Sequence, residues 1–86
     1  MSRYQVGQLV RIKQLQPYTR SPEGFYIRRE AAKNSLKKVV ISRVLPLGDN
    51  QGHYYQVANP KTKRKYLYTY VDSSLIGCQI YKRQQL

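Results

Sequence analysis

The sequence predicts a small all-β domain, a rolled sheet or β-barrel of about five strands with one short helix. Three observations indicate this class. The chain has 86 residues, which suits one domain with one modest core. Short runs of alternating apolar and polar residues recur along it, as in strands that bury one face. Clusters of Gly, Pro, Asn and Asp separate these runs and supply the turns between them.

The first half of the chain contains a predicted strand, a loop and the helix. The strand runs from Tyr4 to Lys13, with a turn or bulge expected at Gly7. Residues 14–24 contain prolines and a glycine and are expected to form a loop. Residues 25–36 are predicted to form a short helix, because apolar residues recur four positions apart. Ser21-Pro22-Glu23 resembles a helix start, although the glycine that follows favours a start nearer Phe25.

The second half is predicted to consist of strands joined by turns. Residues 38–45 are rich in β-branched side chains and form a strand, followed by a turn over residues 46–52. Strands at residues 53–58 and 65–71 flank a hairpin loop at 59–64. After a turn at 72–74, a last short strand holds Leu75, Ile76 and Ile80. We therefore expect one domain over residues 1–80 and a frayed basic end over residues 81–86.

Alternation sets the expected faces of the strand at residues 65–71. Tyr66, Tyr68 and Tyr70 share one face, and Leu67 and Val71 lie on the other. We take Leu67 and Val71 as the better core candidates. At least one of the three tyrosines is also expected to be buried, because a barrel strand often buries a tyrosine.

Two segments resemble SH3-like barrels. The opening segment Tyr4–Ile12 contains the phrase Val-Gly-x-x-Val-Arg-Ile, which begins domains of this group. Residues 24–27, followed by 36–41, are similar to a helical turn and second strand in small SH3-like proteins of phages and bacteria. Those proteins usually have Gly at the position of Lys37 and acidic and Trp residues late in the chain, where this sequence is basic and tyrosine-rich. The resemblance spans Tyr4 to Ile76 and implies a small SH3-like β-barrel, a fold that binds nucleic acid in many members and protein in others.

The charge of the chain points to an anionic partner. The chain contains sixteen Lys and Arg residues and four Asp and Glu residues, which gives a formal net charge of +12. From Asn50 to Val71 there is no acidic residue at all. Such an excess repels itself in a compact domain, so an external anion is the natural reason to keep it. Phosphate backbones are the commonest partner of this kind.

Three groups of residues are candidates for binding nucleic acid. The first is the predicted hairpin tip, where cations crowd together; the alternative is a solvated turn that protects an edge strand from aggregation. The second is a ridge of cations spaced four apart on the predicted helix, unless the helix is shorter and its last lysines belong to the next strand. The third is an exposed tyrosine that would stack on bases; the alternative is that the tyrosines pack in the core. The predicted nucleic-acid-binding residues are Lys61, Lys63, Arg64 and Lys65 at the tip, Arg28, Arg29, Lys33, Lys37 and Lys38 near the helix, and Tyr54 and Tyr68 for stacking.

The sequence gives little support to other functional classes, such as an enzyme, a metal-binding protein or a membrane protein. One histidine and four acidic residues form no recognisable catalytic constellation, so we do not expect an enzyme. We expect no cofactor and no metal, since His53 and Cys78 would leave a coordination sphere half empty. No apolar run is long enough for a transmembrane helix, and the N-terminus has no signal-peptide block. The basic helix lacks a broad apolar face to insert into a membrane surface. A lone cysteine fits a reducing, cytoplasmic setting.

The sequence therefore predicts a small basic protein that binds nucleic acid mainly through phosphate contacts, with little sequence specificity. The alternative is an adaptor, of phage type or regulatory, that docks on an acidic surface of a protein partner. A third possibility is a structural component of a ribonucleoprotein or virion. DNA and RNA, single and double strands, all remain open at this point, as does the oligomeric state.

Overall fold

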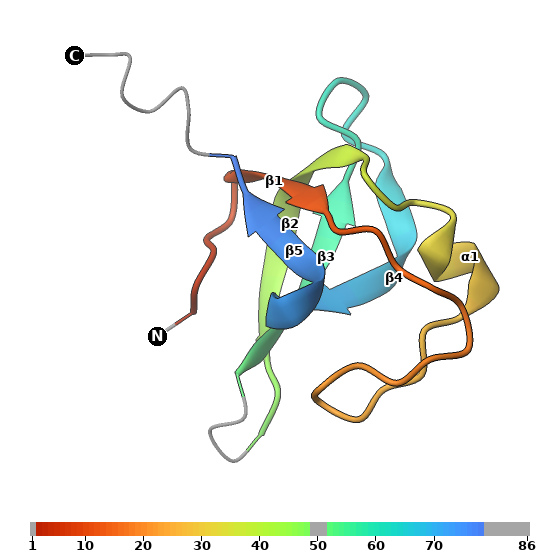
Figure 1. The fold of residues 1–86 in the computed structure, drawn as a ribbon. Coiled ribbons are helices and arrows are strands. Elements are labelled where there is room, and N and C mark those ends of the chain that lie inside the picture. The colour runs from red at the N-terminus through yellow and green to blue at the C-terminus, as the bar shows by residue number, and fades with distance from the viewer. Residues whose placement is uncertain (1, 49–51, 79–86) are drawn as a thin grey trace.

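Five antiparallel strands in one sheet make up most of this computed structural model, which describes residues 2–48 and 52–78. The strand order is β4-β3-β2-β1-β5, so the last strand returns to pair with the first. Figure 1 shows the sheet curling around its interior, with a short helix beside it. This confirms the all-β class with one short helix. The elements are β1 (Leu9–Ile12), α1 (Arg29–Ala32), β2 (Lys38–Pro46), β3 (His53–Ala58), β4 (Lys65–Val71), the 3-10 turn η1 (Asp72–Ser74) and β5 (Leu75–Gly77).

The first strand is shorter than predicted. Residues 4–8 form a turn instead of strand, in which the Gln8 amide donates to the carbonyl of Gln5 at 3.0 Å. Gly7 has a φ of 91°, in the region that glycine adopts without steric cost, which confirms the turn expected there. The turn is fastened to β2, because the Gly7 amide donates to the carbonyl of Ile41 at 2.8 Å. The chain thus enters the sheet only at Leu9.

The predicted helix over residues 25–36 is confirmed only at Arg29–Ala32, because the chain before it forms a β-turn. The Gly24 amide donates to the carbonyl of Ser21 at 2.8 Å, and Gly24 has a φ of 92°. Serine first, proline second and glycine fourth is the pattern that type I β-turns favour. The Ser-Pro pair therefore reverses the chain, and an isolated bridge joins Arg20 to Tyr26 on either side of the turn.

Within residues 25–36 only Arg29–Ala32 is α-helical, and the segment ends at a residue with a strained backbone. Leu36 has a φ of 67°, in the left-handed region. Its amide donates to the carbonyl of Ile12 at 2.7 Å, which ties the end of this segment to β1. Lys38 then begins β2 and pairs with Arg11 of β1. The shorter helix considered above, with Lys38 in the next strand, is the one observed.

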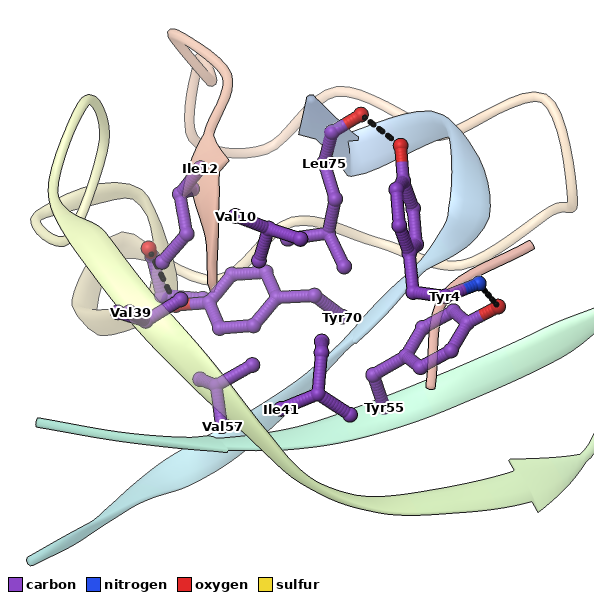
Figure 2. Packing of buried hydrophobic residues seen from close by; sticks show 10 residues of the cluster. Tyr4, Val10, Ile12, Val39, Ile41, Tyr55, Val57, Tyr70 and Leu75 are labelled. Carbon is purple, nitrogen blue, oxygen red and sulfur yellow. Dashed lines mark hydrogen bonds between the residues drawn. The ribbon is translucent and has the colours of Figure 1, made fainter. Parts of the chain in front are cut away.

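Side chains on the inward faces of the strands form the core, and buried tyrosines in it form hydrogen bonds to segments distant in the sequence (Figure 2). The hydroxyl of Tyr4 donates to the carbonyl of Leu75 at 3.1 Å, and the amide of Tyr4 donates to the hydroxyl of Tyr55 at 3.4 Å. Burial, followed by the neighbouring Asp72, raises the pKa of Tyr55 to about 12. The main buried cluster comprises Tyr4, Val10, Ile12, Ala31, Val39, Ile41, Tyr55, Val57, Tyr70 and Leu75.

On β4 the tyrosine face turns toward the core. Tyr70 is opposite the fully buried Tyr55 in the β3–β4 register, so alternation places Tyr68 and Tyr66 on the same side. Tyr70 is buried, and the other two are partly buried against the core. The prediction that one tyrosine would be buried is confirmed, and so is the buried position of Val71. Leu67 as a core residue was wrong: its side chain is 84% exposed, because alternation directs it to the outer face.

Several predicted features lie outside the described residues. These are Ile80 of the last strand, the basic end at 81–86, and the middle of the turn at 46–52. Within the described parts of the chain, no helix is long and apolar enough to cross a membrane.

Candidate nucleic-acid interface

The tip of the β3–β4 hairpin is an ordered turn built around Asn59. The side-chain Oδ1 of Asn59 accepts from the amide of Lys61 at 2.8 Å and from the amide of Thr62 at 3.0 Å. The backbone closes the same turn, since the Lys63 amide donates to the Asn59 carbonyl at 2.8 Å. An asparagine that bonds amides two and three residues on mimics a backbone turn. The tip therefore holds its backbone in one conformation.

This turn presents all the predicted tip cations to solvent. Lys61, Lys63, Arg64 and Lys65 are exposed. Lys63 has a φ of 66°, so a lysine occupies a left-handed position that glycine or asparagine would fill with less strain. Because no acidic residue lies between Asn50 and Val71 in the sequence, no acid from this hairpin dilutes the charge.

The cations near α1 do not form the predicted ridge. Arg29, Lys33 and Lys37 would align only on a continuous helix, and α1 ends at Ala32. Lys37 instead reaches toward β4, where its Nζ donates to Asn34 Oδ1 at 3.2 Å and lies 5.8 Å from the centre of the Tyr66 ring. Tyr66 directly follows Lys65 in β4. The structure thus brings Lys37 to the base of the basic hairpin.

Lys38 adds to the charge at this end of the sheet. It is exposed, and its register partner is the exposed Arg11 of β1. Like charges directly opposite each other on adjacent strands destabilise a sheet. Arg11 finds a partner in the backbone, because its Nη1 donates to the carbonyl of Leu36 at 3.0 Å. Figure 1 shows the start of β2 and the β3–β4 tip at the same end of the sheet.

Arg28 and Arg29 lie at the other end of α1, next to aromatic side chains. Arg28 lines a groove of about 440 Å³ together with both predicted stacking residues, Tyr54 and Tyr68. Arg29 lies over the ring of Tyr18, 5.8 Å from its centre. Lys33 is exposed just after α1. The structure therefore brings Arg28, Tyr54 and Tyr68 to one groove and leaves Lys33 between that groove and Lys37 along the chain.

Sequence reasoning missed several residues of this surface. Phe25 and Tyr26 were expected in a helix, and they line the same groove as exposed loop residues. Arg20 was passed over as part of the 14–24 loop, and it lies over the ring of Tyr26, 5.0 Å from its centre. The available signal was the Ser-Pro-x-Gly turn pattern with aromatic and basic residues on both sides, which is typical of a hairpin that displays its side chains.

The fold and the site together define a small all-β domain with a basic hairpin and an aromatic groove. Comparisons with protein-family models, with curated proteins and with solved structures each find no match.

Proposed function

We propose that this protein binds nucleic acid, mainly through the phosphate backbone. The observation that supports this most strongly is the ordered hairpin tip, which presents Lys61, Lys63, Arg64 and Lys65 to solvent with Lys37 at its base. Lysine and arginine side chains that neutralise phosphates release counterions and provide sequence-independent affinity. A two-stranded ribbon of this kind also has the dimensions to enter a major groove.

The backbone at Lys63 supports the same proposal. A non-glycine residue in the left-handed region costs roughly 1 kcal/mol or more. A turn selected only for stability favours glycine or asparagine there. A lysine at this position fits a role in which the charge matters more than the local strain.

The proposal is tested by titrating the protein against random-sequence duplex and single strands at several salt concentrations. If six or more phosphates are neutralised, affinity falls by roughly 10³-fold or more between about 50 and 200 mM salt. The double variant Lys61→Gln/Lys63→Gln should reduce the slope of log affinity against log salt by roughly 1.4–1.8. The matched control is Arg3→Gln/Arg43→Gln, which removes the same charge from exposed positions outside the tip. Its slope should stay steeper than that of the tip variant.

Two outcomes would overturn the proposal. The first is binding that is weak at low salt or does not change with salt. The second is a specific protein partner that is retained in a pull-down from nuclease-treated lysate while no nucleic acid binds in the titration. The second result would establish the adaptor function instead, in which positive charge steers association with an acidic protein surface.

A further inference from the structure

The loop between β1 and α1 holds aromatic side chains in exposed positions. The Phe25 amide donates to Ser21 Oγ at 3.1 Å, and the Ser21 amide donates to the Phe25 carbonyl at 2.9 Å. These bonds fix the turn, yet the side chains of Phe25 and Tyr26 remain 48% and 67% exposed. Large apolar groups displayed together on a small domain mark a binding surface. The loop is thus ordered in a form that keeps its rings available.

These rings form one side of the groove described above. Tyr54 of β3 and Tyr68 of β4 line it as well, with Leu47 at the start of the β2–β3 turn. Its volume of about 440 Å³ lies within the range of pockets that hold small ring-containing ligands. With Tyr70, five aromatic residues line the groove, and they suit a planar ligand, because flat rings pack well against other flat rings.

Two arginines lie at or beside the groove. Arg28 lines it, and Arg20 lies over the ring of Tyr26 at 5.0 Å from its centre. Among the described residues that line the groove there is no Asp or Glu. The complementary ligand is therefore planar where it meets the rings and negatively charged where it meets the arginines.

A single strand of nucleic acid has both properties, and the groove lies on a path from the hairpin. Tyr68 is three residues after Lys65 on β4, which corresponds to about 10 Å at the usual strand rise. Tyr66, with Lys37 beside it, lies between them. Lys65 and Tyr68 lie on opposite faces of β4, which is the outermost strand of the sheet, so a strand gripped at the tip can cross the edge of β4 and place its bases at the groove.

We infer that the groove holds unpaired bases, so that the preferred ligand of this protein is single-stranded nucleic acid. This inference rests on the proposed function and makes it more specific. Bases of a duplex are stacked inside the helix and cannot enter the groove, whereas bases of a single strand can. Stacking on aromatic side chains tolerates every base, which fits binding with little sequence specificity.

The test uses fluorescence anisotropy with three labelled probes of equal length: an oligothymidine 12-mer, a mixed-sequence duplex, and an abasic deoxyribose-phosphate strand. The abasic strand keeps the phosphates and lacks the bases. We expect the oligothymidine to bind more tightly than the abasic strand by roughly 5- to 150-fold for each stacked base. Phe25→Ala and Tyr26→Ala should each remove most of that advantage and leave the salt slope unchanged.

Tyr18→Ala is the matched control. Tyr18 is 66% exposed and carries an arginine over its ring, as Tyr26 does, but it lies outside this groove. Its replacement should leave the affinity for oligothymidine unchanged. Tyr26→Phe keeps the ring without the hydroxyl and should retain full affinity, which separates stacking from a folding defect.

The outcomes separate this inference from the proposed function. Equal, salt-dependent binding of all three probes, unaffected by Phe25→Ala and Tyr26→Ala, would overturn the groove inference and leave phosphate binding intact. No salt-dependent binding of any probe would overturn both. Polyglutamate of matched charge that binds as tightly as oligothymidine and is weakened by the same groove variants would show that the groove takes an acidic peptide instead.

Discussion

The hydroxyl of Tyr70 on β4 donates a hydrogen bond of 2.9 Å to the carbonyl of Ala31 in α1. The same hydroxyl accepts a bond of 3.1 Å from Asn34 Nδ2 (Figure 2 shows the tyrosine in the core). Asn34 in turn accepts from Lys37 Nζ. One buried tyrosine therefore fixes a single-turn helix against the sheet and sets where Arg28 and Lys37 lie relative to β4.

Tyr70→Phe tests this anchoring. Removing the hydroxyl takes away one of the two donors to the carbonyl of Ala31, which keeps the amide of Asn34 at 3.2 Å, and should lower the free energy of unfolding by about 0.5–1.5 kcal/mol. Urea denaturation followed by circular dichroism measures the change. Asn34→Ala should cost less, because Tyr70 still donates to Ala31. An unchanged unfolding midpoint for Tyr70→Phe would show that the bond does not hold the helix in place.

Lys63→Gly tests whether the positive charge of Lys63 is retained at the tip at a cost in local stability. Glycine adopts the φ of 66° at this position without strain, so the variant should be more stable by roughly 0.5–1 kcal/mol. It should also bind nucleic acid more weakly, with a salt slope lower by roughly 0.7–0.9. Lys61→Gly loses the same charge at a position without positive φ, and should weaken binding without the gain in stability. A Lys63→Gly variant with unchanged stability and unchanged binding would contradict both expectations.

The buried tyrosines predict how stability depends on pH. The pKa of Tyr55 is about 12 in the folded protein, against about 10 in an unfolded chain. Below pH 10 the hydroxyl is protonated in both states, so Tyr55 adds no pH dependence. Above pH 10 the unfolded chain loses this proton first, and stability falls as the pH rises toward about 12.

Urea midpoints measured from pH 8 to 12 check this expectation, with Tyr55→Phe as the comparison. The pKa of Tyr4 and that of Tyr70 are also raised by burial, so the variant should retain part of the alkaline loss. Its stability should fall less steeply above pH 10 than that of the wild type. Identical slopes for the two proteins would show that Tyr55 ionises as easily in the folded state as in the unfolded one.

Leu67→Ser tests the orientation of β4. Because Leu67 is 84% exposed, its replacement should change the free energy of unfolding by no more than about 0.5 kcal/mol. Ile41→Ala is the buried counterpart in β2 and should cost about 2–5 kcal/mol. A large loss for Leu67→Ser would mean that this strand turns its leucine inward, as the choice of Leu67 as a core candidate had assumed.

Most of the strand boundaries could be read from the sequence. The strands at 53–58 and 65–71 and the start of the strand at Lys38 agree with the structure, because period-two alternation and turn residues are local signals. The helix was predicted too long. Residues four apart satisfied the helical period, but only Arg29–Ala32 is helical, since the β-turn at Ser21–Gly24 pairs Tyr26 with Arg20 and Arg28 is extended.

The candidate surface was predictable only in part. The sequence by itself determined that the chain is strongly basic and that four of its cations lie at one hairpin tip, since these depend on composition and local order. Tertiary structure alone decided which face of β4 turns inward, that Lys37 joins the hairpin, and that Phe25 and Tyr26 meet Tyr54 and Tyr68 in one groove. Alternation defines two faces without saying which is buried, and register and long-range packing between distant segments make that choice.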